Sequence, residues 1–138
     1  MPERWSNLEG HSVLVVDDNE DTRQLFRTML EFHGASVVTV GSVDEARAAL
    51  AREIPDVLIT DLAMPGEDGF SLLEYCRYHE EPRLQSLPIM ALTAYGTQEA
   101  QERVLEAGFD AYLAKPVEPT EVGRLVLELA VRKSSSTR

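Results

Sequence analysis

Five short apolar runs, each followed by a segment with helical periodicity, constrain the fold of this chain more than any other feature. The runs cover residues 12–16, 36–40, 57–60, 89–92 and 111–114. Continuous apolar runs of this length are typical of strands that are buried on both faces of a parallel sheet. The alternation therefore predicts an α/β fold, a doubly wound five-stranded parallel sheet with helices on both faces.

The intervening segments carry helix signals. The first is predicted to end at Gly34, and its apolar stripe consists of Leu25, Phe26, Met29 and Leu30. Ser42 and Glu45 predict a capping box, in which each side chain satisfies the main-chain amide of the other residue. Further helices are predicted at about residues 71–78 and 97–107, and the last begins at Pro119, with an apolar stripe formed by Val122, Leu125, Val126, Leu129 and Ala130.

Length and composition indicate one domain. The 138 residues are 43% hydrophobic, and they divide into a leader or linker at 1–10, a domain at 11–132 and a disordered tail at 133–138. The single cysteine, Cys76, excludes an internal disulfide, and it is more consistent with a small core residue than with a reactive thiol. A formal charge of -11 disfavours direct binding to nucleic acid or to an anionic membrane. Because neither a signal sequence nor a membrane-spanning run is evident, we expect a cytoplasmic protein without membrane insertion.

Polar residues follow four of the five predicted strands. They are Asp17 and Asp18, Asp61, Thr93, and Lys115. The carboxyl ends of parallel strands lie at one edge of the sheet, where ligands bind in doubly wound folds. We therefore expect three carboxylates, one hydroxyl and one amine to converge there.

This combination of side chains favours phosphoryl chemistry. Clustered carboxylates repel one another unless they are protonated or bind a hard cation such as Mg²⁺, which is often shared with phosphate oxygens. Asp61 is the candidate nucleophile for an acyl phosphate, and Lys115 would neutralise charge on the transferring group. Thr93 could donate its hydroxyl to a phosphoryl oxygen and so act as a switch.

Each residue also has a purely structural interpretation when it is considered alone. Asp17 and Asp18 could cap a helix, Asp61 could begin a turn, and Thr93 could cap the helix that follows it. The co-occurrence of polar residues at all four of these strand ends favours the functional interpretation.

The motifs Val15-Val16-Asp17-Asp18, Asp61-Leu62-Ala63-Met64-Pro65, Ala91-Leu92-Thr93-Ala94 and Lys115-Pro116 together resemble the receiver domain of two-component response regulators. The resemblance covers residues 11–132 and extends to receivers attached to hybrid sensor histidine kinases. It implies a flavodoxin-like (βα)5 fold with strand order 2-1-3-4-5. It also implies phosphorylation of Asp61 by a histidine kinase or a histidine phosphotransfer domain, a downstream protein partner, and compatibility with a phosphorylation-dependent dimer.

The resemblance assigns further roles at the site. Asp18 and Asp61 would ligate Mg²⁺ directly, Asp17 would assist through water, and the carbonyl of Ala63 would complete the protein ligands. The Lys115–Pro116 bond would be cis. Tyr112 would change rotamer as Thr93 moves, although a tyrosine at this position is also consistent with simple packing. The output face would be formed by the fourth helix, the fifth strand and the fifth helix.

Two positions beside the expected phosphoryl group depart from the usual family pattern. Ala63 has no polar side chain to orient an attacking water, and Tyr95 is bulky enough to hinder that water. We therefore expect a long-lived phosphoryl group.

Other functional classes fit the sequence less well. A degenerate receiver that binds partners without phosphorylation is disfavoured by the complete set of polar residues. A phosphatase or phosphotransferase would need a second acid near Asp61, and Ala63 occupies the nearby position. The glycine motifs of nucleotide-binding loops are missing from every strand–helix turn. We therefore expect no enzyme beyond self-phosphorylation and dephosphorylation.

Overall fold

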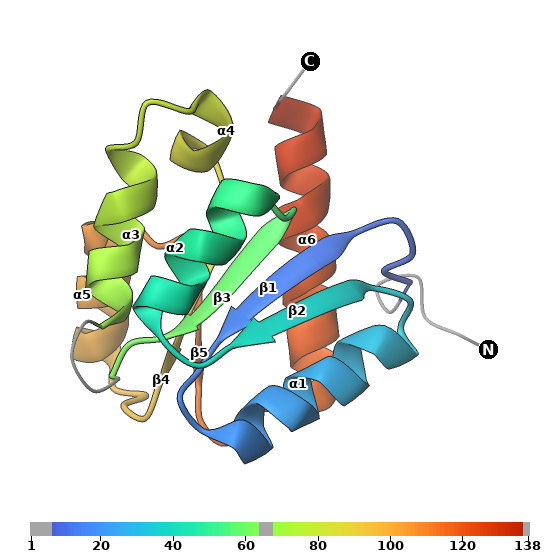
Figure 1. Cartoon of the computed structure of the whole chain (residues 1–138). Coiled ribbons are helices and arrows are strands. Elements are labelled where there is room, and N and C mark those ends of the chain that lie inside the picture. The colour runs from blue at the N-terminus through green and yellow to red at the C-terminus, as the bar shows by residue number, and fades with distance from the viewer. Residues whose placement is uncertain (1–6, 64–67, 137–138) are drawn as a thin grey trace.

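The computed structural model describes residues 7–63 and 68–136. Its centre is a five-stranded parallel sheet with strand order β2-β1-β3-β4-β5, which confirms the predicted fold class and the order that the resemblance implied. The strands are β1 (Ser12–Val16), β2 (Ser36–Val40), β3 (Val57–Asp61), β4 (Ile89–Thr93) and β5 (Ala111–Ala114). Helices cover both faces of this sheet (Figure 1).

The helices lie close to the predicted segments. They are α1 (Glu20–Phe32), α2 (Val43–Arg52), α3 (Gly69–Arg77), α4 (Pro82–Gln85), α5 (Gln98–Ala107) and α6 (Pro119–Ser136). The sequence did not predict α4, because four residues are too few to establish a helical period. Residues 64–67, whose composition predicts a turn before α3, lie outside the described residues.

Two apolar cores flank the sheet. On one side, α1 and α6 pack against the sheet around Phe26, Leu30 and Val126. On the other side, α2, α3 and α5 enclose the second core, which includes Leu50 and Leu72. Each central strand supplies both cores, because successive strand residues point to opposite faces. This double burial explains the continuous apolar runs of the sequence.

Two local predictions were wrong in detail. Leu25 is 47% exposed, because it lies at the margin of the apolar stripe of α1, whose centre is formed by Phe26 and Leu30. The capping box forms only in part. The Ser42 hydroxyl accepts a hydrogen bond from the Glu45 amide, but the Glu45 carboxylate accepts from the amide of Gly41, one residue before the cap.

Two structural features extend into the segments that the sequence analysis assigned to a leader and a tail. Leu8, assigned to the leader, is fully buried in the core beneath α1, and its amide donates to the carbonyl of His33 at 2.7 Å. Helix α6 continues to Ser136 and includes the first four residues of the predicted disordered tail at 133–138. Among the residues that the structure describes, no helix combines the length and the apolar character that crossing a membrane requires.

Candidate functional site

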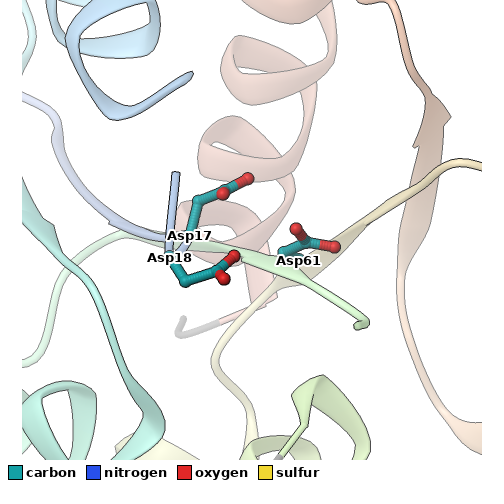
Figure 2. A group of neighbouring side chains, drawn as sticks. All are labelled: Asp17, Asp18 and Asp61. Atoms are coloured by element: carbon teal, nitrogen blue, oxygen red, sulfur yellow. The ribbon is translucent and has the colours of Figure 1, made fainter. Parts of the chain in front are cut away.

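The polar strand ends converge at the carboxyl edge of the sheet, as predicted. Asp17 and Asp18 directly follow β1, and Asp61 is the last residue of the adjacent strand β3. One carboxylate oxygen from each of the three lies within 4.8 Å of the others, and Figure 2 shows the three side chains side by side. Asp17 and Asp61 are buried, whereas Asp18 is exposed. The edge therefore concentrates negative charge beside solvent.

Lys115 bridges two of these carboxylates. It follows β5, and its Nζ lies 2.9 Å from Oδ2 of Asp61 and 3.2 Å from Oδ2 of Asp17. Strand β5 is two strands away from β3, so the long lysine side chain spans the edge occupied by β4. One cation is thus shared by two acidic groups.

The turn after β1 leaves both acidic side chains free to face the site. Asn19, and neither Asp17 nor Asp18, is the N-cap of α1, because its side chain accepts from the amide of Thr22 at 2.9 Å. The interpretation of the aspartate pair as a helix cap is therefore wrong. The Asn19 amide donates to Oδ1 of Asp17 at 2.9 Å. Sequence reasoning missed Asn19, although the N-cap preference of asparagine before an acidic first turn is a usable signal.

The Asp61 carboxylate is fixed through both of its oxygens. Oδ2 accepts from Lys115, and Oδ1 accepts from the amide of Ala63 at 3.2 Å, so Asp61 also begins a turn. Gly69 at the start of α3 packs against the same segment. A Cβ at this position would lie 2.6 Å from the carbonyl oxygen of Asp61, so only glycine allows this close approach.

Burial and mutual repulsion shape the electrostatics of the site. Desolvation, with a further contribution from the Asp61 charge, raises the pKa of Asp17 even though the Asn19 amide and Lys115 favour its ionised form. Desolvation alone would lower the pKa of Lys115, but its hydrogen bonds to Asp61 and Asp17 outweigh burial and raise that pKa. The site thus holds more negative charge than one lysine can neutralise.

The donor set is suited to a hard divalent cation. Carboxylate oxygens are the preferred ligands of Mg²⁺, and each oxygen of Asp17 and Asp61 retains a lone pair after its hydrogen bond. Among the described residues, no hydrogen bond or ion pair engages the Asp18 carboxylate. Asp18 and Asp61 therefore have free ligand capacity on the solvent side, and the residues present fit the ion that the sequence predicted.

Thr93 ends β4 with its hydroxyl engaged by the loop that follows. Its Oγ1 accepts from the amide of Tyr95 at 2.9 Å and lies 3.4 Å from the Tyr95 carbonyl oxygen. Thr97, and not Thr93, caps α5, so the interpretation of Thr93 as a helix cap is also wrong. The hydroxyl of Thr93 is buried at the same edge as Asp61 and holds the loop between β4 and α5.

A cleft opens beside Asp61. It is lined by Asp61, Phe70, Tyr95, Arg103, Val104 and Lys115, among others. Tyr95 is 71% exposed at its rim. Sequence reasoning missed Phe70 and Arg103, because both lie on helices and reach the site only through the packing of α3 and α5 around the sheet edge.

The remaining predicted residues are placed as follows. The Lys115–Pro116 peptide bond is cis, as the resemblance implied. Tyr112 is partly buried and packs against the core on the side of α2, α3 and α5. Cys76 is fully buried in that core, and desolvation raises the pKa of its thiol to about 11, which confirms a packing role.

Comparison with known proteins gives one consistent family. A family model of the response regulator receiver domain matches residues 13–126. An uncharacterised 14.6 kDa protein of Leptolyngbya boryana is 48% identical and covers 86% of this chain and 89% of its own length. The transcriptional regulatory protein GltR of Pseudomonas aeruginosa is 40% identical over 84% of this chain, which spans only 47% of GltR. The hybrid signal transduction histidine kinase D of Dictyostelium discoideum is 38% identical, and this chain spans 9% of it.

Solved structures agree with the sequence relatives. The receiver domain of Francisella response regulator 1452 superimposes with a TM-score of 0.81 at 30% identity, covering 89% of this chain and 98% of the other. The receiver domain of sensor histidine kinase PA1611 from Pseudomonas aeruginosa has a TM-score of 0.79 at 31% identity, covering 88% and 98%, and holds a magnesium ion in its active-site cleft. With its sheet order, its acidic edge and these matches, the chain belongs to the response regulator receiver domain family.

Proposed function

We propose that Asp61 is the phospho-acceptor of this receiver domain and that it takes its phosphoryl group from the phosphohistidine of a histidine kinase or a histidine phosphotransfer domain. Family membership makes the chain a phospho-acceptor switch of two-component signalling. The observation that carries the assignment to Asp61 is its contact with Lys115 at 2.9 Å within the three-carboxylate cluster. The complete cluster speaks against a degenerate receiver.

The acceptor chemistry follows from the positions of the side chains. An Asp61 oxygen attacks phosphorus and forms a P–O bond as the P–N bond of the donor breaks, and the imidazole nitrogen keeps the electron pair. Lys115 stays within reach of the phosphoryl oxygens and balances their charge. The Thr93 hydroxyl donates to a phosphoryl oxygen instead of remaining with the Tyr95 loop. That exchange moves the loop toward the acceptor, and Tyr112 follows as the loop vacates space.

A magnesium ion completes the proposal. Asp18, Asp61 and the Ala63 carbonyl would hold it, with Asp17 assisting through water. When bound, the ion would neutralise charge on the transferring phosphoryl group. The domain would act on itself only, catalysing its own phosphorylation and dephosphorylation.

Intact mass after incubation with acetyl phosphate and MgCl₂ tests this proposal. We expect the wild type to gain the mass of one phosphoryl group, and we expect no gain in Asp61→Asn or with EDTA. Asp21→Asn is the matched control, because Asp21 is an exposed acid of α1 outside the cluster. Equal phosphorylation of Asp61→Asn and the wild type would contradict the assignment. Absence of any gain, followed by absence of transfer from a phosphorylated histidine kinase, would instead favour the phosphorylation-independent module.

A further inference from the structure

Arg23 contacts the turn between β1 and α1 that contains Asp17 and Asp18, which we call the acidic turn. Arg23 lies in α1, and its Nη1 donates a hydrogen bond of 2.7 Å to the main-chain carbonyl oxygen of Asp17. The amide of Asp17 in turn donates to the carbonyl of Val40 at 3.1 Å, where β1 and β2 end together. Asp17 is thus held on its amide side by the sheet and on its carbonyl side by Arg23.

The Asp17 carbonyl belongs to the peptide unit that joins the two acidic residues. A peptide unit is planar, so fixing its oxygen also fixes the direction in which the chain enters Asp18. Asp18 follows this peptide and, among the described residues, has no side-chain partner of its own. The hydrogen bond from Arg23 is charge-assisted and therefore stronger than a neutral one. The orientation of the peptide that leads into Asp18 thus depends on one guanidinium group, whereas the Asp17 carboxylate is also held by Asn19 and Lys115.

Gly41 lies against the same guanidinium. A Cβ at position 41 would lie 3.0 Å from Nη1 of Arg23 and 3.5 Å from Oε1 of Glu45. The missing side chain therefore leaves the space that the guanidinium occupies beside Asp17. A methyl group there would displace a flexible side-chain end and no backbone atom, so its effect on folding is small.

Arg27 lies one helical turn further along α1 and has a different task. Its guanidinium donates to the Val37 carbonyl and to the Thr39 hydroxyl, each at 3.2 Å, and pairs with Glu31. Arg27 therefore joins α1 to β2 as Arg23 joins α1 to the end of β1, but none of its hydrogen bonds to the described residues reaches Asp17 or Asp18. Arg27 is therefore a matched control for Arg23 on the same helix.

We propose that Arg23 is a positioning residue for the cation site, which sets the peptide between Asp17 and Asp18 through its hydrogen bond to the Asp17 carbonyl. The inference rests on the proposed function, because it assumes that Asp18 and Asp61 ligate the ion. Arg23 itself touches neither the ion nor the phosphoryl group.

The test is titration of the full chain with MgCl₂, followed by the amide chemical shifts of the residues around the acidic turn. We expect Arg23→Met to raise the dissociation constant for Mg²⁺ by ~10-fold, the lower end of the range for residues that orient metal ligands. Arg23→Lys should recover most of the loss, since lysine keeps a cationic donor. Gly41→Ala should weaken Mg²⁺ binding in the same direction while the melting temperature changes little.

Arg27→Met separates positioning from general stability. We expect it to lower the melting temperature at least as much as Arg23→Met while it leaves Mg²⁺ affinity at the wild-type value. Equal affinity in Arg23→Met and the wild type would overturn the inference, and so would an equal loss in both arginine variants. Failure of the wild type itself to bind Mg²⁺ would instead count against the proposed cation site, so the two failures are distinguishable.

Discussion

Charged residues serve different purposes at the two edges of the sheet. At the amino ends of β4 and β5, Asp110 accepts from the amide of Ile89 at 2.8 Å and from Arg77 at 3.0 Å, so one carboxylate meets one guanidinium. At the carboxyl edge, three carboxylates share Lys115. The first arrangement is balanced and ties strands to helices. The second leaves an excess of negative charge that a cation and a phosphoryl group can use.

The partners of Arg77 explain why the amino edge is structural. The Arg77 guanidinium leaves α3 and also donates to the carbonyl oxygens of Gln85, Leu87 and Gly108. It therefore joins α3 to the segments that enter β4 and β5. At the carboxyl edge the groups that face Asp17 and Asp61 are main-chain amides of turns and a single amine. These fix the carboxylates in place and do not neutralise all of them.

Replacement of Lys115, the cation that Asp17 and Asp61 share, should have the largest effect. We expect Lys115→Met to lower the initial rate of phosphorylation by acetyl phosphate ~100-fold, the loss typical when one donor to the transition-state charge is removed. Rates are measured by intact mass at saturating MgCl₂. A rate within a factor of about two of the wild type would show that Lys115 does not serve the transfer, since a single lost donor ordinarily costs far more. Lys133→Met, in the other lysine of the chain, is the control.

Replacement at the balanced edge should affect folding and not chemistry. We expect Arg77→Leu to lower the free energy of unfolding by about 2 kcal/mol, because several carbonyls and Asp110 lose a charged donor at a partly exposed position. Urea denaturation measures the change. Once the variant is folded, its phosphorylation rate should equal that of the wild type. A slower rate in the folded variant would mean that the two edges are coupled.

Removal of one surplus charge should stabilise the domain while weakening its site. Because burial raises the pKa of Asp17, ionisation of this group opposes folding, and we expect Asp17→Asn to gain of order 1 kcal/mol at neutral pH without Mg²⁺. The folded-state pKa lies above the unfolded value, so the penalty in the wild type is full above the folded pKa and disappears as pH falls toward the unfolded pKa.

Thermal unfolding of Asp17→Asn and the wild type at several pH values measures this difference. The advantage of the variant should be largest near pH 7 and should shrink as the solution is acidified. An advantage that grows on acidification would have the wrong sign. In the same samples MgCl₂ should stabilise the wild type more than the variant, because the surplus charge is what attracts the ion.

The smallest effect concerns the lifetime of the phosphoryl group. We expect Tyr95→Ala to dephosphorylate several-fold faster, because removal of the ring from the rim of the cleft gives water access to the acceptor. Loss of the added mass over time, after the donor is removed, measures this rate. Slower or unchanged decay would contradict the prediction. Tyr78→Ala, which removes an exposed ring that does not line this cleft, is the control.

Much of the architecture could be predicted because its signals are local. The apolar runs of β1 and β2 define strands within the chain itself, and Gly34 and Gly108, both at positive φ, mark where helices end. The convergence of Asp17, Asp61 and Lys115 also followed, because parallel strands place their carboxyl ends at one edge. Helix α4 and the exposure of Leu25 could not be predicted, since a short helix has no period and the margin of a stripe depends on its neighbours.

The sequence by itself determined the strand–helix alternation and the identity of the residues at each strand end, because both follow from side-chain chemistry along the chain. Only the tertiary structure decided how those residues are held. The contacts of Arg23 with the Asp17 carbonyl and of Gly69 with the Asp61 carbonyl join segments whose spacing carries no periodic or compositional signal. Every residue has a main-chain carbonyl, so the sequence does not indicate which carbonyl a given residue will contact. Such contacts are established only when the elements pack together.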